Sequence, residues 1–245
     1  MIAGFRWGLE RSGRMETSVP GFGGLLVLVG SCWRIGMFAK DRDLLVIEPG
    51  LFREVMWNGQ RLLSGTGDLA GGLLTLTSGS FIEGAIGPGH VVLIDSVPME
   101  VVSVQNATVA TVSIMRGDTN SSFIPGKWVE GATVEVFTFE PQIAIVHRQI
   151  LAMIGIDADD PDGLGDSAVT NPGALMVLEA LGALHLIYAS AGAPGRGGEA
   201  FLDRAKQYQQ RFSMQRGSVV AMIDLDGDGI AETRRHPNSF VLSRG

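Results

Sequence analysis

The sequence predicts an α+β fold, in which a small antiparallel β-barrel or sandwich precedes a C-terminal bundle of about three helices. Three observations predict it. From residue 43 onwards, short apolar runs alternate with Gly, Pro, Asn and Asp, which is typical of strands and turns. After Pro141 the apolar residues follow a helical period. Residues 197–232 then combine a long amphipathic helical pattern with an abrupt acidic end.

Length and composition limit the classes of protein that the chain can belong to. Its 245 residues can bury a sizeable core, as one large domain or two small ones. A net charge of −7 argues against a nucleic-acid-binding surface, and a single cysteine excludes an internal disulfide framework. We expect an N-terminal extension over residues 1–42, a β-rich module over 43–140, a helical domain over 141–223, and an Asp-rich turn and tail over 224–245.

The N-terminal extension contains an apolar run at residues 21–30, which is shorter than the roughly 20 residues of a membrane-spanning helix. Three arginines precede this run and Ser31-Cys32 follows it. One interpretation is a secretory signal with a lipoprotein-type cleavage site at Cys32. The other is an irregular extension, or a protein whose true start is Met37.

Six runs in the first half predict strands, at residues 44–47, 73–77, 91–94, 100–104, 107–114 and 133–139. Turns are expected at residues 95–98 and 105–106. Close spacing of the runs favours a barrel or a sandwich. Glycine-rich stretches at residues 65–72 and 84–89 are expected to bend the corners of the sheet.

Three helices are expected in the second half. Pro141 and Pro172 each suit the first turn of a helix. Residues 174–191 are apolar on almost every side, which is typical of the buried centre of a bundle and, by length alone, of a membrane span; interrupting charges favour the core. The long helix should place one apolar stripe against the core, made of Phe201, Ala205, Tyr208, Phe212, Val219 and Met222, and Gly217 should break or kink it.

An acidic loop follows the long helix and is the sharpest local signal for a site. Its carboxylates alternate with other residues: Asp224, Asp226 and Asp228. With Gly229 at position six, this spacing matches the start of a calcium loop, but position twelve, which should carry a bidentate carboxylate, is Arg235. Glu232 or a neighbouring subunit would have to complete the cation site. The alternative is a tight turn in which the aspartates bind backbone N–H groups and the chain reverses into a strand at residues 240–242.

No other pattern in the sequence predicts a catalytic, metal-binding or nucleotide-binding site. Residues 65–70 match a dinucleotide-binding fingerprint in letters only, because they lead into an expected strand rather than a helix. The four histidines have no metal-ligand spacing, and His185 is expected to be a hydrogen-bonded core residue. No serine has the context of a nucleophile elbow. The sequence therefore predicts no catalytic residue, no enzyme activity and no cofactor other than calcium.

Two parts of the chain carry a resemblance to a known family. Residues 89–94, 97–104 and 110–116, GHVVLI, VPMEVVSV and ATVSIMR, resemble the β module of some phage head–tail adaptor proteins. Residues 183–188, 204–208 and 220–229 are similar to the helical connector proteins that lie beneath the portal. The likeness covers residues 43–235 and is one of order and texture, without a catalytic signature.

This resemblance implies a structural virion protein at the neck of a tailed bacteriophage, made in the bacterial cytoplasm. Its partners would be itself, in a ring of about 12 copies, the portal protein, and a tail or stopper protein. DNA would pass through the ring without sequence recognition, and an acidic wall suits such a conduit. No membrane is involved.

The alternative function is an exported or lipid-anchored calcium-binding protein of bacterial origin. It predicts an N-terminus processed at Cys32 and a melting temperature that rises with calcium.

Overall fold

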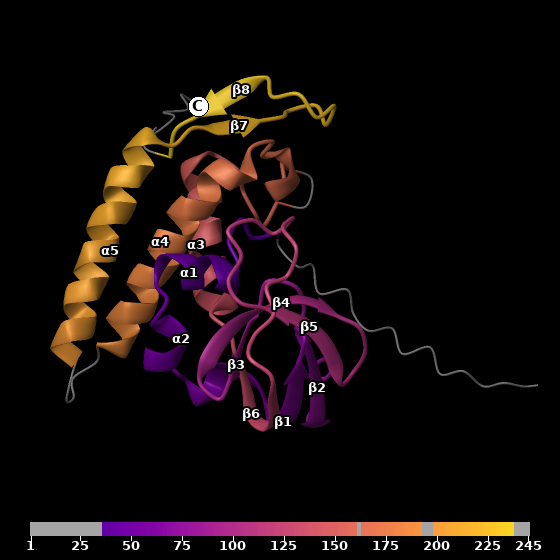
Figure 1. Cartoon of the computed structure of the whole chain (residues 1–245). Helices are drawn as coiled ribbons and strands as arrows, with labels where there is room; N and C mark the ends of the chain where they lie inside the picture. Colours follow the sequence, from indigo (N-terminus) through magenta and orange to yellow (C-terminus); the bar gives the residue numbers. More distant parts are fainter. Residues whose placement is uncertain (1–35, 161–162, 193–197, 238–245) are drawn as a thin grey trace, which may run out of the picture. The chain divides into compact units, whose positions relative to one another are not determined.

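Six antiparallel strands close into a barrel in the computed structural model, which describes residues 36–160, 163–192 and 198–237 (Figure 1). The strands follow the order β1-β2-β5-β4-β3-β6 around the barrel. Their bounds are β1 Arg61–Ala70, β2 Leu73–Ser78, β3 Val91–Ile94, β4 Val97–Val104, β5 Val109–Ser113 and β6 Val129–Phe137. The predicted α+β class is therefore confirmed, and the β part is a barrel.

The barrel interior is filled by one apolar cluster. Alternate residues of β2 are buried, as expected for a strand with one face on a core. All four residues of β3 are buried, because this strand also contacts residues outside the barrel. The buried members of the cluster are Leu63, Leu69, Leu74, Leu76, Phe81, Ile86, Val92, Ile94, Met99, Val101, Ala110, Val112, Ala132, Val134 and Val136.

Strand β1 was not expected from the sequence. Its two glycines, Gly65 and Gly67, lie opposite β2, and a Cβ atom at either position would collide with the backbone of Ser78 or Thr75. Glycine is thus required by the close approach of two strands. The dinucleotide-like residues 65–70 lie inside this strand and have no βαβ context.

The predicted strand at residues 44–47 is wrong, because these residues belong to helix α1, Asp41–Ile47. A run of four apolar residues does not distinguish a strand from a buried helix. Two acidic residues in the first turn, Asp41 and Asp43, favour the helix through its dipole. A second short helix, α2, spans Leu51–Glu54, and a 3-10 turn, η1, spans Asn58–Gln60 before the barrel begins.

Helices α3, Glu140–Met153, and α4, Pro172–Ala191, follow the barrel, and the expected prolines lie in their first turns. A 3-10 turn, η2, spans Asp166–Ala168 between them. Helix α4 is long and apolar enough to cross a membrane by length and composition, yet more than half of that stretch is buried in protein. Its packing is that of the central helix expected from the sequence.

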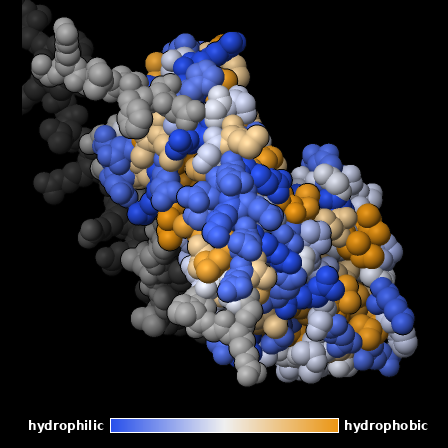
Figure 2. Space-filling view, turned by 90° about the vertical axis from the view of Figure 1, so that its left-hand side faces the viewer, coloured by the Kyte–Doolittle hydropathy of each residue, from blue (hydrophilic) through white to orange (hydrophobic). Residues whose placement is uncertain are grey.

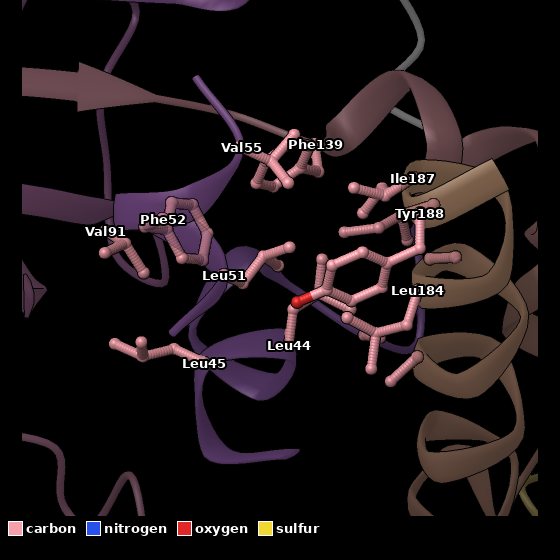
Figure 3. Packing of buried hydrophobic residues seen from close by; sticks show 14 of the residues in the cluster. Leu44, Leu45, Leu51, Phe52, Val55, Val91, Phe139, Leu184, Ile187 and Tyr188 are labelled. Carbon is pink, nitrogen blue, oxygen red and sulfur yellow. The ribbon is translucent and has the colours of Figure 1, made fainter. Parts of the chain in front are cut away.

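The cluster around α4 joins helices that lie on both sides of the barrel in the sequence. Leu44, Leu51 and Phe52 from α1 and α2 pack with Leu184, Ile187 and Tyr188 from α4 (Figure 3). Val91 and Phe139 bring β3 and the start of α3 to the same cluster. Burial of each large side chain contributes roughly 1.5–3 kcal/mol. Helices that precede and follow the barrel in the sequence therefore share one core, which β3 also joins.

Helix α5, Gly198–Ser218, ends earlier than predicted. Val219 follows its last residue, and Met222 lies in β7, Ala221–Ile223, so these two residues do not belong to the helical stripe. The end comes one residue after Gly217, in agreement with the expected break. A hairpin of β7 and β8, Thr233–Arg235, then completes the described chain.

Candidate functional site

The acidic loop lies at the turn of the β7–β8 hairpin, where four carboxylates come together. One oxygen from each of Asp224, Asp226, Asp228 and Glu232 lies within 4.8 Å of the others. Asp224 is buried, whereas the other three are exposed. Carboxylate oxygens are ligands of hard cations such as Ca²⁺, which takes about six to eight of them, so these four residues would supply only part of a calcium site. The structure thus brings together all three predicted site residues and Glu232, which the sequence analysis named as a possible further ligand.

Backbone N–H groups already bind these carboxylates. Gly227 and Gly229 donate to the two oxygens of Asp224, each at 2.7 Å. These hydrogen bonds, that of Gly229 first, hold the pKa of Asp224 below its usual value. Leu225 donates to Glu232 at 2.5 Å, which closes the loop from its other end. Both glycines have positive φ, of 82° and 87°, so the tight turn requires them.

Arg235, at the position where a calcium loop needs a carboxylate, has a structural contact elsewhere. Its guanidinium donates to the backbone oxygens of Ile154 (2.7 Å) and Gly155 (3.0 Å) at the end of α3. The chain reverses into β8. The strand predicted at residues 240–242 lies outside the described residues. The local geometry is that of a hydrogen-bonded turn with an acidic surface, and Arg235 attaches it to the helices.

Helix α5 contacts the rest of the protein through a narrow stripe. Tyr208 stacks on Tyr188 of α4 at a centroid distance of 5.8 Å and donates to Glu48 at 2.6 Å. Arg204 binds Glu54 at the end of α2 and lies over the Tyr188 ring. The predicted inner stripe is confirmed for its first four residues, which are buried or half-buried: Phe201, Ala205, Tyr208 and Phe212.

The opposite face of α5 is open to solvent along most of the helix. Figure 2 views the molecule from the side on which α5 lies in Figure 1, and hydrophilic residues predominate across the centre of this face. Its exposed side chains are mainly polar, with Leu202 and Met214 as the large apolar exceptions. We define the α5 outer face by its exposed residues Leu202, Asp203, Lys206, Gln207, Gln209, Gln210, Ser213 and Met214.

A buried charge cluster joins the barrel to α1. Glu100 of β4 is fully buried and accepts from Nε of Arg42 at 2.6 Å and from Nε of Arg116. Arg42 also donates to the backbone oxygen of Arg116 at 2.9 Å. Arg116 donates to the backbone oxygens of Thr119 (2.8 Å) and Ser121 (2.6 Å). The cluster fixes the loop after β5 onto both the barrel and the helix.

A surface pocket of about 620 Å³ lies over this cluster. Its walls include Phe38, Lys40, Glu100 and Arg116, together with Met176 near the start of α4. The two guanidinium groups already have carboxylate and carbonyl partners. The arrangement is that of a structural junction between the barrel and the helices.

A second buried pair connects α3 and α4. His147 and Glu179 are both fully buried, and Nδ1 of His147 donates to Glu179 at 2.9 Å. Burial raises the pKa of Glu179, and the hydrogen bond from His147 opposes that rise. His185, the core histidine of the sequence prediction, is half-buried and has its Nδ1 at 3.0 Å from the backbone oxygen of Ala205 on α5.

The sequence prediction missed both buried clusters. Glu100 lies 58 residues from Arg42 and 16 from Arg116, so no local spacing reveals their contact. The available signal was a single glutamate inside the apolar strand 97–104, a position where a buried charge needs a partner.

Comparison of the chain with protein-family models, with curated proteins and with solved structures finds no match. Two exposed surfaces stand out among the described residues. One is the α5 outer face, and the other is the acidic turn of the β7–β8 hairpin.

Proposed function

We propose that the chain is a structural subunit of the neck of a tailed bacteriophage, which forms a ring between the portal and a tail or stopper protein. The observation that carries this proposal is the α5 outer face. A 21-residue helix that contacts its own fold through one stripe leaves a continuous surface for a neighbouring copy. In a ring, this surface would meet a different surface of the next subunit, because a head-to-tail contact joins unlike patches.

Further features of the chain are compatible with a conduit for DNA. The acidic turn adds exposed negative charge to a chain whose net charge is −7. Like charge keeps phosphates from binding to a wall. The barrel precedes helices α3, α4 and α5, which is the order that the family resemblance implies, and α1 and α2 come before the barrel. In this proposal the function resides in subunit contacts rather than in catalysis.

The test is the oligomeric state of the purified protein, alone and mixed with a portal protein, measured by native mass spectrometry and negative-stain imaging. We expect a closed ring of about 12 copies, formed either alone or on the portal. A protein that stays monomeric and does not bind the portal protein contradicts the proposal.

A matched pair of variants tests the surface itself. Gln207→Glu with Gln210→Glu adds two negative charges to the α5 outer face, and should weaken the ring without lowering the melting temperature. Asn58→Asp with Asn120→Asp adds the same charge at exposed positions of the barrel side. If both double variants form rings equally well, the α5 outer face is not part of the contact between subunits.

A calcium-binding function is the second candidate, because four carboxylates lie within 4.8 Å of one another. It predicts that millimolar calcium raises the melting temperature relative to a chelator, and that Asp226→Asn with Asp228→Asn removes the effect. The same hypothesis includes export and cleavage at Cys32, which lies outside the described residues. An intact mass that retains residues 1–31 would contradict the lipid anchor.

A further inference from the structure

A third exposed surface lies at one end of the barrel, on the segment of residues 114–128 that joins β5 to β6. A Cβ atom on Gly126 would be 2.9 Å from the side chain of Met99 and 3.0 Å from that of Leu69, both members of the barrel cluster. The segment therefore crosses the end of the barrel interior. We define the barrel-end patch by five large apolar residues, each between 39% and 61% exposed: Leu73, Ile114, Phe123, Ile124 and Trp128.

Four members of the patch are neighbours at the β1–β2 turn. The N–H of Ile114 donates to the backbone oxygen of Ile124 at 3.0 Å, so the two ends of the connecting segment lie side by side. Phe123 precedes Ile124, and its ring lies directly against Gly72, where a Cβ atom would come within 2.6 Å of it. Leu73 follows Gly72 in the chain and begins β2.

Trp128 joins the patch from the start of β6. Val129 pairs with Leu69 of β1, and the antiparallel register brings Trp128 beside Ala70, which pairs with Leu73 on its other side. Single exposed apolar residues are ordinary on protein surfaces. A contiguous group that includes Trp and Phe is typical of a protein–protein contact.

The charges around the patch are opposite in sign to those of α5. The exposed or half-buried charged residues beside the patch are three acidic residues and one basic residue: Asp68, Asp118, Glu130 and Lys127. Arg116, in the same segment, is buried and paired with Glu100. Helix α5 instead carries four basic residues against two acidic ones: Arg204, Lys206, Arg211 and Arg216 against Glu199 and Asp203. In a chain with a net charge of −7, α5 is thus a basic element.

The α5 outer face also offers side chains that suit an aromatic patch. One ridge of the helix, about 18 Å long, has an exposed residue at every fourth position: Leu202, Lys206, Gln210 and Met214. Met214 is 78% exposed, more than any other large apolar residue in the described part of the chain. Thioether groups contact aromatic rings favourably, and lysine ammonium groups bind the face of a Trp ring.

We propose that the barrel-end patch binds the α5 outer face of a second copy of this chain. The helix of one subunit packs across the end of the next subunit's barrel, and the basic helix meets the acidic surroundings of the patch. The inference rests on the proposed ring, because a head-to-tail contact needs a second, unlike surface on the same chain. It assigns that second surface to the barrel.

Cross-linking of two single-cysteine variants, with and without the portal protein, tests this contact. Lys127→Cys lies between Gly126 and Trp128, and Gln210→Cys lies on the α5 outer face; both are made with Cys32→Ser, so that each chain has one cysteine. A short bismaleimide reagent should join the mixed variants into a covalent dimer that contains one copy of each, and should not dimerise either variant alone. Glu83→Cys, at an exposed position of the turn after β2, replaces Lys127→Cys as the matched control and should give no such dimer.

Removal of apolar side chains tests the patch by a second measurement. Trp128→Gln with Ile124→Gln should raise the protein concentration needed for half-maximal assembly at least about 10-fold, the effect of losing one energetically dominant interface residue. Met56→Gln with Ile82→Gln removes two equally exposed apolar side chains elsewhere and should leave assembly unchanged. The melting temperature of each double variant shows whether it is folded.

The outcomes separate this inference from the proposed function. Rings that form without the mixed cross-link, or in which Lys127→Cys cross-links to itself, overturn the inference and leave the ring standing. A mixed cross-link within open chains of subunits supports the inference and contradicts a closed ring. A protein that is monomeric both alone and with the portal protein, and gives no cross-link, overturns both.

Discussion

The barrel interior and the junction between the barrel and the helices are both buried, but they are built from different chemistry. Every member of the barrel cluster is apolar. The junction and the helical part contain buried charged residues: Asp41, Arg42, Glu100, Arg116, His147 and Glu179. An apolar interior tolerates apolar replacements that conserve volume, whereas a buried charge that loses its partner is strongly unfavourable. Large effects of single substitutions should therefore concentrate at the junction.

The largest effect is expected at Glu100. Glu100→Ala removes the carboxylate shared by Arg42 and Arg116 and leaves two buried guanidinium groups without it. We expect a loss of about 3–5 kcal/mol in the free energy of unfolding, measured by urea denaturation. Glu130→Ala, at an exposed position of β6, is the control and should change this free energy by less than about 0.5 kcal/mol. If Glu100→Ala lowers the free energy of unfolding no more than Glu130→Ala does, the junction is not unusually sensitive to single substitutions.

A pH dependence should also arise at the junction, from Asp41. This residue accepts from the N–H of Phe139 at 2.8 Å, and burial raises its pKa to about 7. A carboxyl whose pKa is raised on folding contributes fully at pH values below the ordinary pKa near 4, and this contribution is lost as the pH rises through 7. We expect a fall on the order of 3 kcal/mol in the free energy of unfolding between pH 5 and pH 8.

Asp41→Asn tests this assignment, because the amide keeps the shape and an acceptor oxygen but does not ionise. The variant should be more stable than the wild type at pH 8, and its stability should change much less between pH 5 and pH 8. Chemical denaturation at a series of pH values measures both quantities. A variant with the slope of the wild type would show that another group causes the dependence.

Much of the fold could be predicted from local pattern. Residues 91–94 and 133–137 are β-branched runs, and Pro141 and Pro172 mark helix starts, so these elements carry their signal within a few residues. Strand β1 could not be found in this way, since Gly65 and Gly67 are required by the neighbouring strand. Helix α1 was mistaken for a strand because its four apolar residues have no visible period.

The polar contacts of the molecule likewise include some that local spacing predicts and others that depend on tertiary packing. Asp224, Asp226 and Asp228 are close in sequence, and their meeting in one turn followed from their spacing. The contacts of Glu100 with Arg42 and of His147 with Glu179 span 58 and 32 residues, and depend on how the barrel and the helices pack. Only the presence of single charged residues in apolar segments indicated them. Long-range polar contacts need a tertiary structure to be seen.

The smallest effects are expected in the acidic turn, where buried and exposed carboxylates can be compared within one loop. Asp224 is buried and accepts hydrogen bonds from Gly227 and Gly229 with both oxygens, whereas Asp226 is exposed and accepts one, from Asp228 at 3.2 Å. Asp224→Asn should lower the free energy of unfolding by more than Asp226→Asn does, since an amide has one acceptor oxygen in place of two. Asp226→Asn should lower it by less than about 0.5 kcal/mol. Urea denaturation without added calcium measures both, and equal effects would mean that the turn is held by its backbone conformation rather than by the Asp224 carboxylate.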